Sequence, residues 1–304
     1  MERRFDRRMF SKTIGFGLGA AMLGAAEAQG APKRRLKIGH TGINWGYRPE
    51  DAEQAIKDTA SLGYHGYESF GSILEAWESK GGLGRVLEAS KLPLVSAFCG
   101  ANVLDPAKRK DEVAKLVRWG QLIKKYGGSI VALNADGAPR KREGYVYKDH
   151  KANIVAGLNE VCKALAEIGV VGALHQHTGS CIETSDEVYS VLESVDTRYV
   201  KFGPDIGQLA KGGSDPVKIV KDFLALIEHV HLKDWNGGPY WAEYCPLGMG
   251  KVDIPAILDL LEKSKIKAML MVELDYSKGA PMTPFETART SKAYLEKQGY
   301  EFRS

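Results

Sequence analysis

The chain has 304 residues, of which 44% are hydrophobic and 26% charged, values that are ordinary for a globular protein. This length fits one large domain or two ordinary ones, with a core that needs no disulfide or metal to hold it. The net charge is +4, and five basic and three acidic residues lie within the first 28, which leaves +2 for the rest. That remainder is too small and too evenly spread to indicate a nucleic-acid partner.

The first 30 residues are predicted to be a twin-arginine signal peptide. Residues 7–12, RRMFSK, resemble the twin-arginine export motif, and a Gly/Ala-rich apolar stretch follows that is too short to span a membrane comfortably. Small residues at 26–28 then offer a cleavage position, and no cysteine follows that could carry a lipid. We therefore expect a periplasmic or secreted protein without a stable membrane anchor. The alternative, an amphipathic first helix of the domain, is disfavoured by the glycine content.

Residues 33–304 alternate short apolar runs, typical of strands, with segments of helical periodicity. The expected strands cover residues 36–45, 64–71, 93–100, 129–135, 170–179, 199–208, 228–236 and 268–277. The expected helices cover residues 49–63, 83–93, 105–126, 153–168, 184–195, 216–227, 253–264 and 283–299. Eight such units in roughly 270 residues predict an α/β fold, a (β/α)8 TIM barrel in a single domain. An open doubly wound sheet is the alternative, but GHTGINWG lacks the G-x-G-x-x-G order of its phosphate turn.

Polar residues stand at the expected carboxyl ends of the strands, where TIM barrels place their chemistry. The last strands are otherwise apolar, yet Asp205, His231 and Glu273 fall at equivalent depths on the sixth, seventh and eighth. Side chains from neighbouring strands would converge on one point, and this mixed N/O set suits manganese, cobalt, zinc or iron better than calcium. We therefore expect one divalent metal ion bound by these three residues.

At these residues the chain resembles the xylose-isomerase-like TIM barrels, which include sugar isomerases and epimerases, inosose dehydratase and type-2 apurinic endonucleases. The likeness is greatest to inosose dehydratase. The matching stretches are LHQHTGSCIETSDEV, FGPDIGQLAKGGSDPVKIVKDF, EHVHLKDWN, PLGMGKVDIPAILDLLEKS and MLMVELD, in order across residues 170–275. The resemblance implies a metal held by Glu, Asp, His and Glu from strands five to eight. Asp205, His231 and Glu273 match three positions, and His175 stands at the fourth, as a ligand or a substrate contact.

The resemblance also implies a metal-dependent isomerase or epimerase that acts on a keto-sugar or cyclitol through metal-stabilised enolisation. A metal that chelates a ketone oxygen and its neighbouring hydroxyl acidifies the C–H between them, and a nearby base removes the proton. Glu273 is the expected base, His175 or His177 the second acid or base, and Lys233 the cation that neutralises the oxyanion. Loss of a β-hydroxyl would instead give an inosose-dehydratase-like lyase. Symmetric two-base epimerisation is disfavoured because His175 replaces one carboxylate.

Further side chains are expected to contact the carbohydrate. Glu68 and Trp45 would line the sugar pocket, and Gln208 would hydrogen-bond a hydroxyl group. Asp234 and Trp235 stand at the end of the seventh strand, and Trp235 opens a glycine-containing aromatic loop that suits a substrate lid. Two functions of other classes stay open: a non-catalytic exported sugar-binding barrel and a phosphodiester-cleaving metalloenzyme. The sequence does not determine the oligomeric state, and a homo-oligomer is compatible with it.

Overall fold

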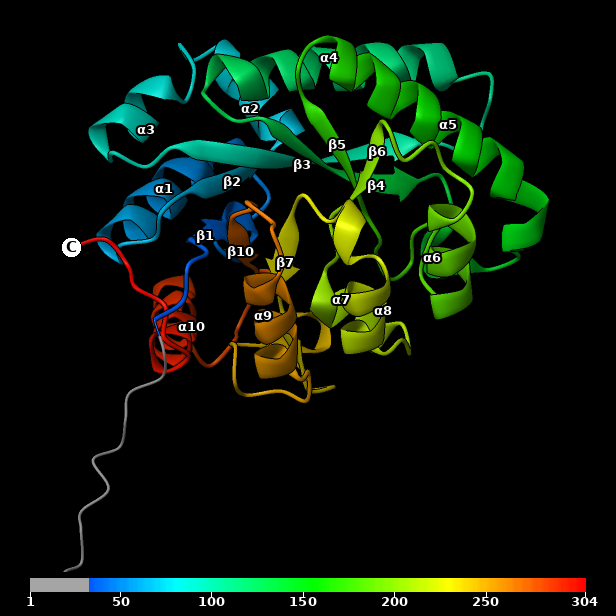
Figure 1. The fold of residues 1–304 in the computed structure, drawn as a ribbon. Helices are drawn as coiled ribbons and strands as arrows, with labels where there is room; N and C mark the ends of the chain where they lie inside the picture. Colours follow the sequence, from blue (N-terminus) through cyan, green and yellow to red (C-terminus); the bar gives the residue numbers. More distant parts are fainter. Residues whose placement is uncertain (1–32) are drawn as a thin grey trace, which may run out of the picture. The chain divides into compact units, whose positions relative to one another are not determined.

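The computed structural model describes residues 33–304, so the predicted signal peptide lies outside the described residues. Eight parallel strands form one curled sheet, as the sequence predicts, and Figure 1 shows them at the centre of the domain. They are β1 (Ile38–Thr41), β2 (Tyr67–Phe70), β3 (Leu94–Asn102), β4 (Ile130–Asp136), β5 (Val171–His175), β6 (Val200–Phe202), β7 (Val230–Leu232) and β10 (Leu270–Val272). Most strand residues are buried, because parallel strands of a barrel are covered on both faces.

The sheet runs in the order β6-β5-β4-β3-β2-β1-β10-β7, which leaves β6 and β7 at its two ends. Two isolated parallel bridges, Phe202 to Ile227 and Asp205 to His231, join these ends and close the barrel. The join is therefore made by single bridges rather than by a continuous ladder. One of these bridges aligns two of the predicted metal ligands at the same depth.

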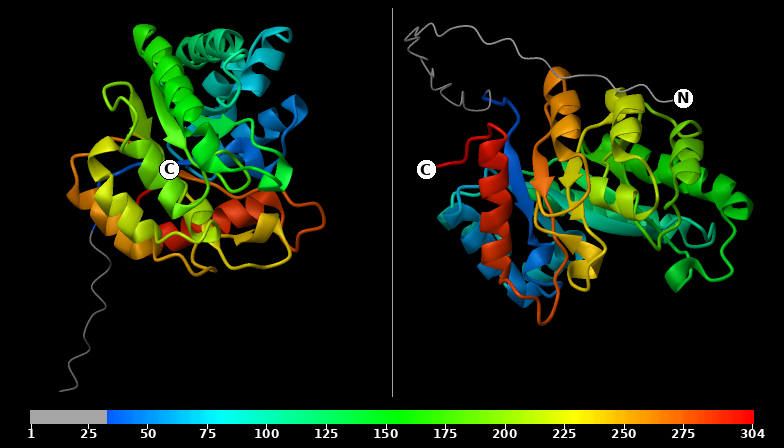
Figure 2. Two further views of the ribbon diagram at one scale, coloured as in Figure 1. Left: turned by 90° about the vertical axis from the view of Figure 1, so that its right-hand side faces the viewer. Right: turned by 90° about the horizontal axis from the view of Figure 1, so that it is seen from below.

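Helices cover the outside of the sheet, and Figure 2 shows this from two further sides. They are α1 (Ala52–Ser61), α2 (Gly71–Glu78), α3 (Gly84–Ala89), α4 (Arg109–Lys125), α5 (Tyr147–Glu167), α6 (Ser185–Leu192), α7 (Ile206–Lys211), α8 (Pro216–Asp222), α9 (Ile254–Lys263) and α10 (Pro284–Lys297). Neighbouring helices pack side by side, as α4 and α5 do beside β3, β4 and β5. In the part of the chain that the structure describes, no helix is both long enough and apolar enough to cross a membrane.

Helix α9 illustrates how local sequence sets an element of the outer layer. Asp253 precedes the helix and its carboxylate accepts a hydrogen bond from the amide of Ala256, which satisfies a free donor of the first turn. Pro255 stands in that turn, where a missing N–H costs nothing. The buried residues of the helix are Ile254, Ile257, Leu258 and Leu261. Their spacing of three and four forms the apolar stripe that faces the barrel.

The structure differs from the sequence-based elements mainly at strand ends. The strand expected to reach residue 208 ends at Phe202, because Asp205 caps a new helix, α7. Helix α2 follows β2 directly and was not predicted. The loop after β7 folds into an antiparallel hairpin of β8 (Asp234–Trp235) and β9 (Tyr244–Cys245), which was also not predicted. These elements are too short to produce a recognisable hydrophobic period.

Candidate active site

Three predicted site residues meet at the carboxyl ends of β5, β6 and β7. One ligand atom from each of His175, Asp205 and His231 lies within 4.8 Å of the other two, and all three side chains are fully buried. His175 is the last residue of β5, and Asp205 bridges His231 directly across the join. The β/α topology therefore delivers the three side chains to one depth of the barrel.

Glu273 completes this group from the end of β10. Its Oε2 lies 2.8 Å from Nδ1 of His231, and its Oε1 lies 2.6 Å from Nζ of Lys233. Burial disfavours its charged form, but Lys233 and His231 hold the pKa of Glu273 well below its usual value. All four side chains expected around a metal thus stand together, with Glu273 ionised.

The hydrogen bonding of this group fits a bound cation. Within the described residues, neither ring nitrogen of His175 has a hydrogen-bond partner, although the side chain is fully buried. Asp205 divides its carboxylate: Oδ1 accepts from the amides of Gly207 and Gln208 at 2.9 Å each, whereas Oδ2 accepts no hydrogen bond. Buried polar atoms are nearly always paired, so unpaired acceptors aimed at one point are suited to a divalent metal.

Lys233 lies beside the group and neutralises part of its charge. Its Nζ is 2.6 Å from Glu273, 2.7 Å from Asp275 and 3.4 Å from Asp205, and the side chain is fully buried. Burial disfavours the ammonium, but Asp275, Glu273 and Asp205 raise the pKa of Lys233 well above its usual value. The ring of Tyr244 covers Nζ at 4.3 Å from the ring centroid. Lys233 therefore contacts the carboxylates of the site rather than open solvent.

A cavity of about 310 Å³ opens directly over Glu273. It is lined by Thr41, Gly42, Ile43, Tyr47, Glu68, Phe70, Phe98, His177, Glu273 and Asp275. These residues come from or follow the carboxyl ends of the strands, which is where TIM barrels bind ligands. The volume is at the small end of ligand sites, and aromatic walls with a few carboxylates suit a single sugar-sized molecule.

His177 lines the cavity, but its nitrogens are engaged. Oε1 of Gln208 accepts from the backbone amide of Thr178 at 3.1 Å and from its hydroxyl at 2.7 Å. This fixes the amide so that Nε2 of Gln208 donates to Nε2 of His177, at 2.7 Å. The other ring nitrogen, Nδ1, then donates to the carbonyl of Thr178 at 2.7 Å. Gln208 therefore binds His177, whereas the sequence predicted a direct contact of Gln208 with substrate.

Three of the expected substrate contacts have other partners in the structure. The carboxylate of Asp234 accepts hydrogen bonds from the amides of Trp235, Gly248, Gly250 and Val252, which leaves it no free position. A Cβ at Gly250 would lie 2.1 Å from Asp234 Oδ1, so glycine is required for the loop to approach. The sequence motif KD, which ends in Asp234, and the motif PLGxGxVD, which supplies Gly248 and Gly250, are therefore parts of one hydrogen-bonded unit.

The structure places both predicted tryptophan contacts outside the lining of this cavity. The indole of Trp45 donates to the carboxylate of Asp58 on α1 at 2.7 Å, and Trp45 does not line the cavity. Trp235 packs in a satellite core with Trp241, Tyr244 and Leu274 in and beside the β8–β9 hairpin. Both tryptophans stand near strand ends, and sequence position alone does not tell an aromatic residue that lines a cavity from one that packs in the core.

Several residues of the site were not predicted. Asp275 lies two residues after Glu273, and His229 lies two residues before His231, and each contacts the network of its neighbour. Side chains two residues apart on a strand point to the same face. This spacing could have identified Asp275 and His229 as site residues. Tyr47 and Phe98, which form cavity walls, carry no comparable signal.

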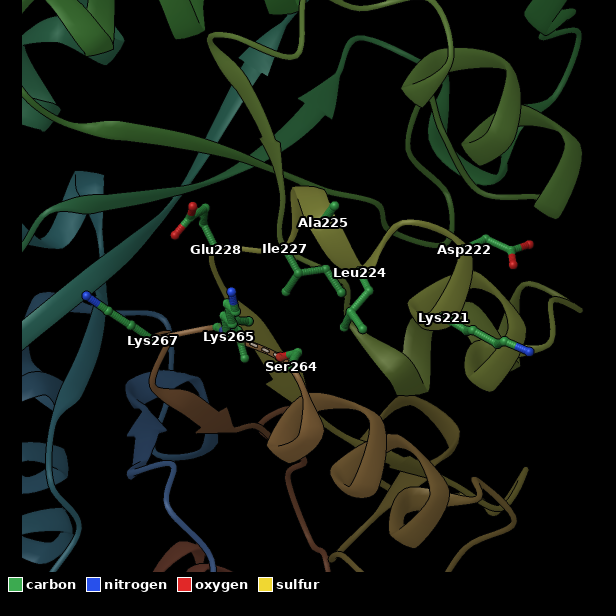
Figure 3. A pocket seen from close by; sticks show the side chains of 10 residues that line it. Lys221, Asp222, Leu224, Ala225, Ile227, Glu228, Ser264, Lys265 and Lys267 are labelled. Atoms are coloured by element: carbon green, nitrogen blue, oxygen red, sulfur yellow. Dashed lines mark hydrogen bonds between the residues drawn. The ribbon is translucent and has the colours of Figure 1, made fainter.

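A larger cavity, of about 590 Å³, lies elsewhere and is shown in Figure 3. Its lining residues precede β7 and β10 in the chain and are Lys221, Asp222, Leu224, Ala225, Ile227, Glu228, Ser264, Lys265, Ile266 and Lys267. It therefore lies at the amino ends of these strands, opposite to the end that carries catalytic residues in TIM barrels. Its charged residues are lysines and acids of the surface, without a buried polar group aimed into it.

His40 on β1 should make the metal-free protein sensitive to acid. Burial lowers its pKa from 6.5 to about 4, while a hydrogen bond from Nδ1 to the carbonyl of Thr41 opposes this shift. The unfolded chain therefore binds this proton more readily, and the stabilisation is complete above pH 6.5 and is lost as the pH falls towards 4. Between pH 7.5 and 5, in the presence of EDTA, the free energy of unfolding should fall by about 2 kcal/mol more than in His40→Gln. Equal pH dependence of both proteins in denaturant titrations would refute this.

Comparison with known proteins agrees with the geometry. Residues 56–298 match the sequence model of the xylose isomerase-like TIM barrel family. An inosose dehydratase of Clostridium botulinum (strain Alaska E43 / Type E3) is 22% identical over 295 residues, which cover 87% of this chain and 97% of the relative.

Two solved structures share the fold. The 3-keto-D-glucoside 4-epimerase of E. coli, in its apo form, superimposes with a TM-score of 0.67 at 18% identity, covering 86% of this chain and 99% of its own. The IOLI protein with a bound zinc atom gives a TM-score of 0.71 at 17% identity, covering 86% and 98%. With a matching family model over most of its length and a barrel of the same topology, this chain belongs to the xylose isomerase-like TIM barrel family.

Proposed function

We propose that this protein is a metal-dependent enzyme that enolises a small keto-sugar or cyclitol, as an isomerase or epimerase. The observation that carries the proposal is the position of Glu273, which both adjoins His231 and lines the sugar-sized cavity. Membership of a family whose relatives include sugar epimerases and inosose dehydratases supports the substrate class. We further propose export by the twin-arginine route, on the motif at residues 7–12.

The residues of the chain divide the work as follows. His175, Asp205, His231 and Glu273 would hold one divalent ion, which would polarise the substrate carbonyl and acidify the adjacent C–H. Glu273 would take up that proton, since its carboxylate is ionised and faces the cavity. Lys233 would keep Glu273 in place through their ion pair at 2.6 Å, and Asp275 in turn holds Lys233 at 2.7 Å. Phe70 and Phe98 would exclude water from one side of the substrate.

A dehydratase that eliminates a β-hydroxyl is the second candidate. Epimerisation requires an acid or base on each face of the substrate. Here His175 is fully buried and does not line the cavity, and both nitrogens of His177 are engaged. Neither of the two histidines predicted as the second acid or base is therefore free to act opposite Glu273, which favours a reaction that works from one face. The curated inosose dehydratase relatives point the same way.

Metal removal and isotope exchange would test the proposal. The protein is stripped with EDTA, reloaded with Mn²⁺ or Co²⁺, and incubated in D2O with ketoses, 3-keto-sugars and inososes. We expect deuterium to enter one substrate next to its carbonyl, at a rate that falls by about 100-fold or more without metal. Proton NMR of the products separates isomerisation from loss of water.

The control variant is Glu273→Gln, which keeps the shape of the side chain and removes the base. Exchange that continues unchanged in this variant would contradict the role of Glu273. Binding of a sugar without exchange by the metal-loaded protein would instead support a non-catalytic sugar-binding barrel.

A further inference from the structure

Glu68 is on β2, yet its carboxylate binds two histidines that belong to the β7 segment. Its Oε1 lies 2.9 Å from Nε2 of His231, and its Oε2 lies 2.8 Å from Nε2 of His229. Ser96, its neighbour on β3, donates its hydroxyl to Oε2 at 2.6 Å. All four side chains are buried, so water does not compete for these contacts.

The carboxylate determines where the hydrogens of the two imidazoles lie. An ionised carboxylate only accepts hydrogen bonds, so each Nε2 must carry a hydrogen that points at Glu68. The two Nε2 atoms approach to 3.1 Å because both face the same group. A neutral imidazole with its hydrogen on Nε2 has its lone pair on Nδ1. In His231, Nδ1 faces Oε2 of Glu273 at 2.8 Å and donates a hydrogen to it in the metal-free protein. A cation bound by Glu273 would replace that hydrogen, whereas Glu68 keeps the one on Nε2.

We propose that Glu68 is a positioning residue that fixes the tautomer and ring orientation of His231, so that Nδ1 is presented to a divalent cation. This rests on the proposed function, because it assigns His231 as a metal ligand. A carboxylate that holds the second nitrogen of a ligand histidine fixes the ring and raises its basicity. Ser96 and His229 occupy Oε2, which leaves Oε1 to serve His231 alone.

A second cation between Glu68, His229 and His231 is the competing explanation, because their ligand atoms lie within 4.8 Å of one another. Such an ion would have to replace both hydrogens that now bridge to the carboxylate. It would also make His231 bridge two ions. Hydrogen bonds from both imidazoles already account for their short distances to the Glu68 carboxylate, so positioning is the simpler assignment.

Titration of the metal-free protein with Co²⁺ tests the proposal without a substrate. Glu68→Gln keeps the size of the side chain but removes the charge that holds both imidazoles. We expect it to bind Co²⁺ about 10- to 100-fold more weakly and to change the visible d–d absorption of the bound ion. Ser96→Ala removes one hydrogen bond to Oε2 and should weaken binding by roughly 3-fold. Glu53→Gln, at an exposed pair with Lys57 on α1, controls for charge and should match the wild type.

Each outcome bears on the assignment. Equal affinity and equal spectra of Glu68→Gln and wild type would overturn it, and should Glu68→Gln not fold, equality of Ser96→Ala with Glu53→Gln would do the same. Two Co²⁺ ions per wild-type chain, one of them lost in Glu68→Gln, would replace positioning by a second metal site. A wild type that binds no Co²⁺ would overturn the proposed function as well, whereas normal Co²⁺ binding with an unaffected Glu68→Gln overturns this inference alone.

Discussion

Asp205→Asn should abolish metal binding and turnover while leaving the fold nearly unchanged. Oδ1 of Asp205 caps α7, and Asn caps helices as well as Asp, so the free energy of unfolding should change by less than about 1 kcal/mol. Oδ2 accepts no hydrogen bond and lies 3.4 Å from Nζ of Lys233; the substitution replaces it by an amide nitrogen or by a neutral oxygen. Because loss of an outer partner alone costs 10- to 100-fold in metal affinity, loss of a direct ligand should cost at least about 100-fold. Turnover should fall by about 1,000-fold, which equals about 4 kcal/mol.

Asp215→Asn is the matched control for this prediction. Asp215 caps α8 by accepting from the amide of Lys218, and it lies outside the cavity. Both variants should unfold at similar denaturant concentrations, and only Asp205→Asn should lose Co²⁺ binding and activity. An Asp205→Asn protein that keeps Co²⁺ affinity within a few-fold of the wild type would exclude Asp205 as a ligand.

Lys233→Met should destabilise the metal-free protein strongly. The substitution leaves Glu273, Asp275 and Asp205 buried without their shared ammonium. Removing one partner of a buried charge group costs about 3–5 kcal/mol, because the remaining charges keep their desolvation penalty. An added divalent cation would offset part of this repulsion, so Co²⁺ should raise the melting temperature of the variant more than that of the wild type.

Lys211→Met provides the comparison for Lys233. Lys211 also lies over the ring of Tyr244 and pairs with a carboxylate, Glu243, but it is partly exposed. Its loss should cost no more than about 1 kcal/mol, as is usual for surface ion pairs. Chemical unfolding of both variants in EDTA measures the difference. Similar losses in the two variants would mean that Lys233 is not the cation on which the buried carboxylates depend.

The fold and the convergence of the expected ligands could be predicted because both follow from the strand pattern. Eight apolar runs separated by helical segments specify the barrel, and the depth of Asp205, His231 and Glu273 along their strands follows from counting residues. The structure brings these side chains together, with His175 as the fourth. The family resemblance places His175 at the fourth position, and the strand pattern alone does not decide between a ligand and a substrate contact.

Side-chain partners across the barrel could not be predicted in this way. Glu68 is 161 residues from His229, and nothing local in either segment indicates that they meet. Asp234 adjoins the site in sequence but turns to the amides of a glycine loop, and Gln208 turns to His177. A residue at the end of a strand has several directions available, and tertiary packing selects one. Sequence patterns place the backbone of such residues and leave the hydrogen bonds undetermined.

The join between β6 and β7 would give the four proposed ligands a mechanical role. Elsewhere neighbouring strands pair through two or more consecutive residues. Between β6 and β7 there are two isolated bridges, and Asp205 and His231 form one of them. A cation shared by these two residues would cross-link the barrel at the place where the fewest backbone bridges join neighbouring strands. Metal binding would then also stabilise the closure of the barrel between β6 and β7.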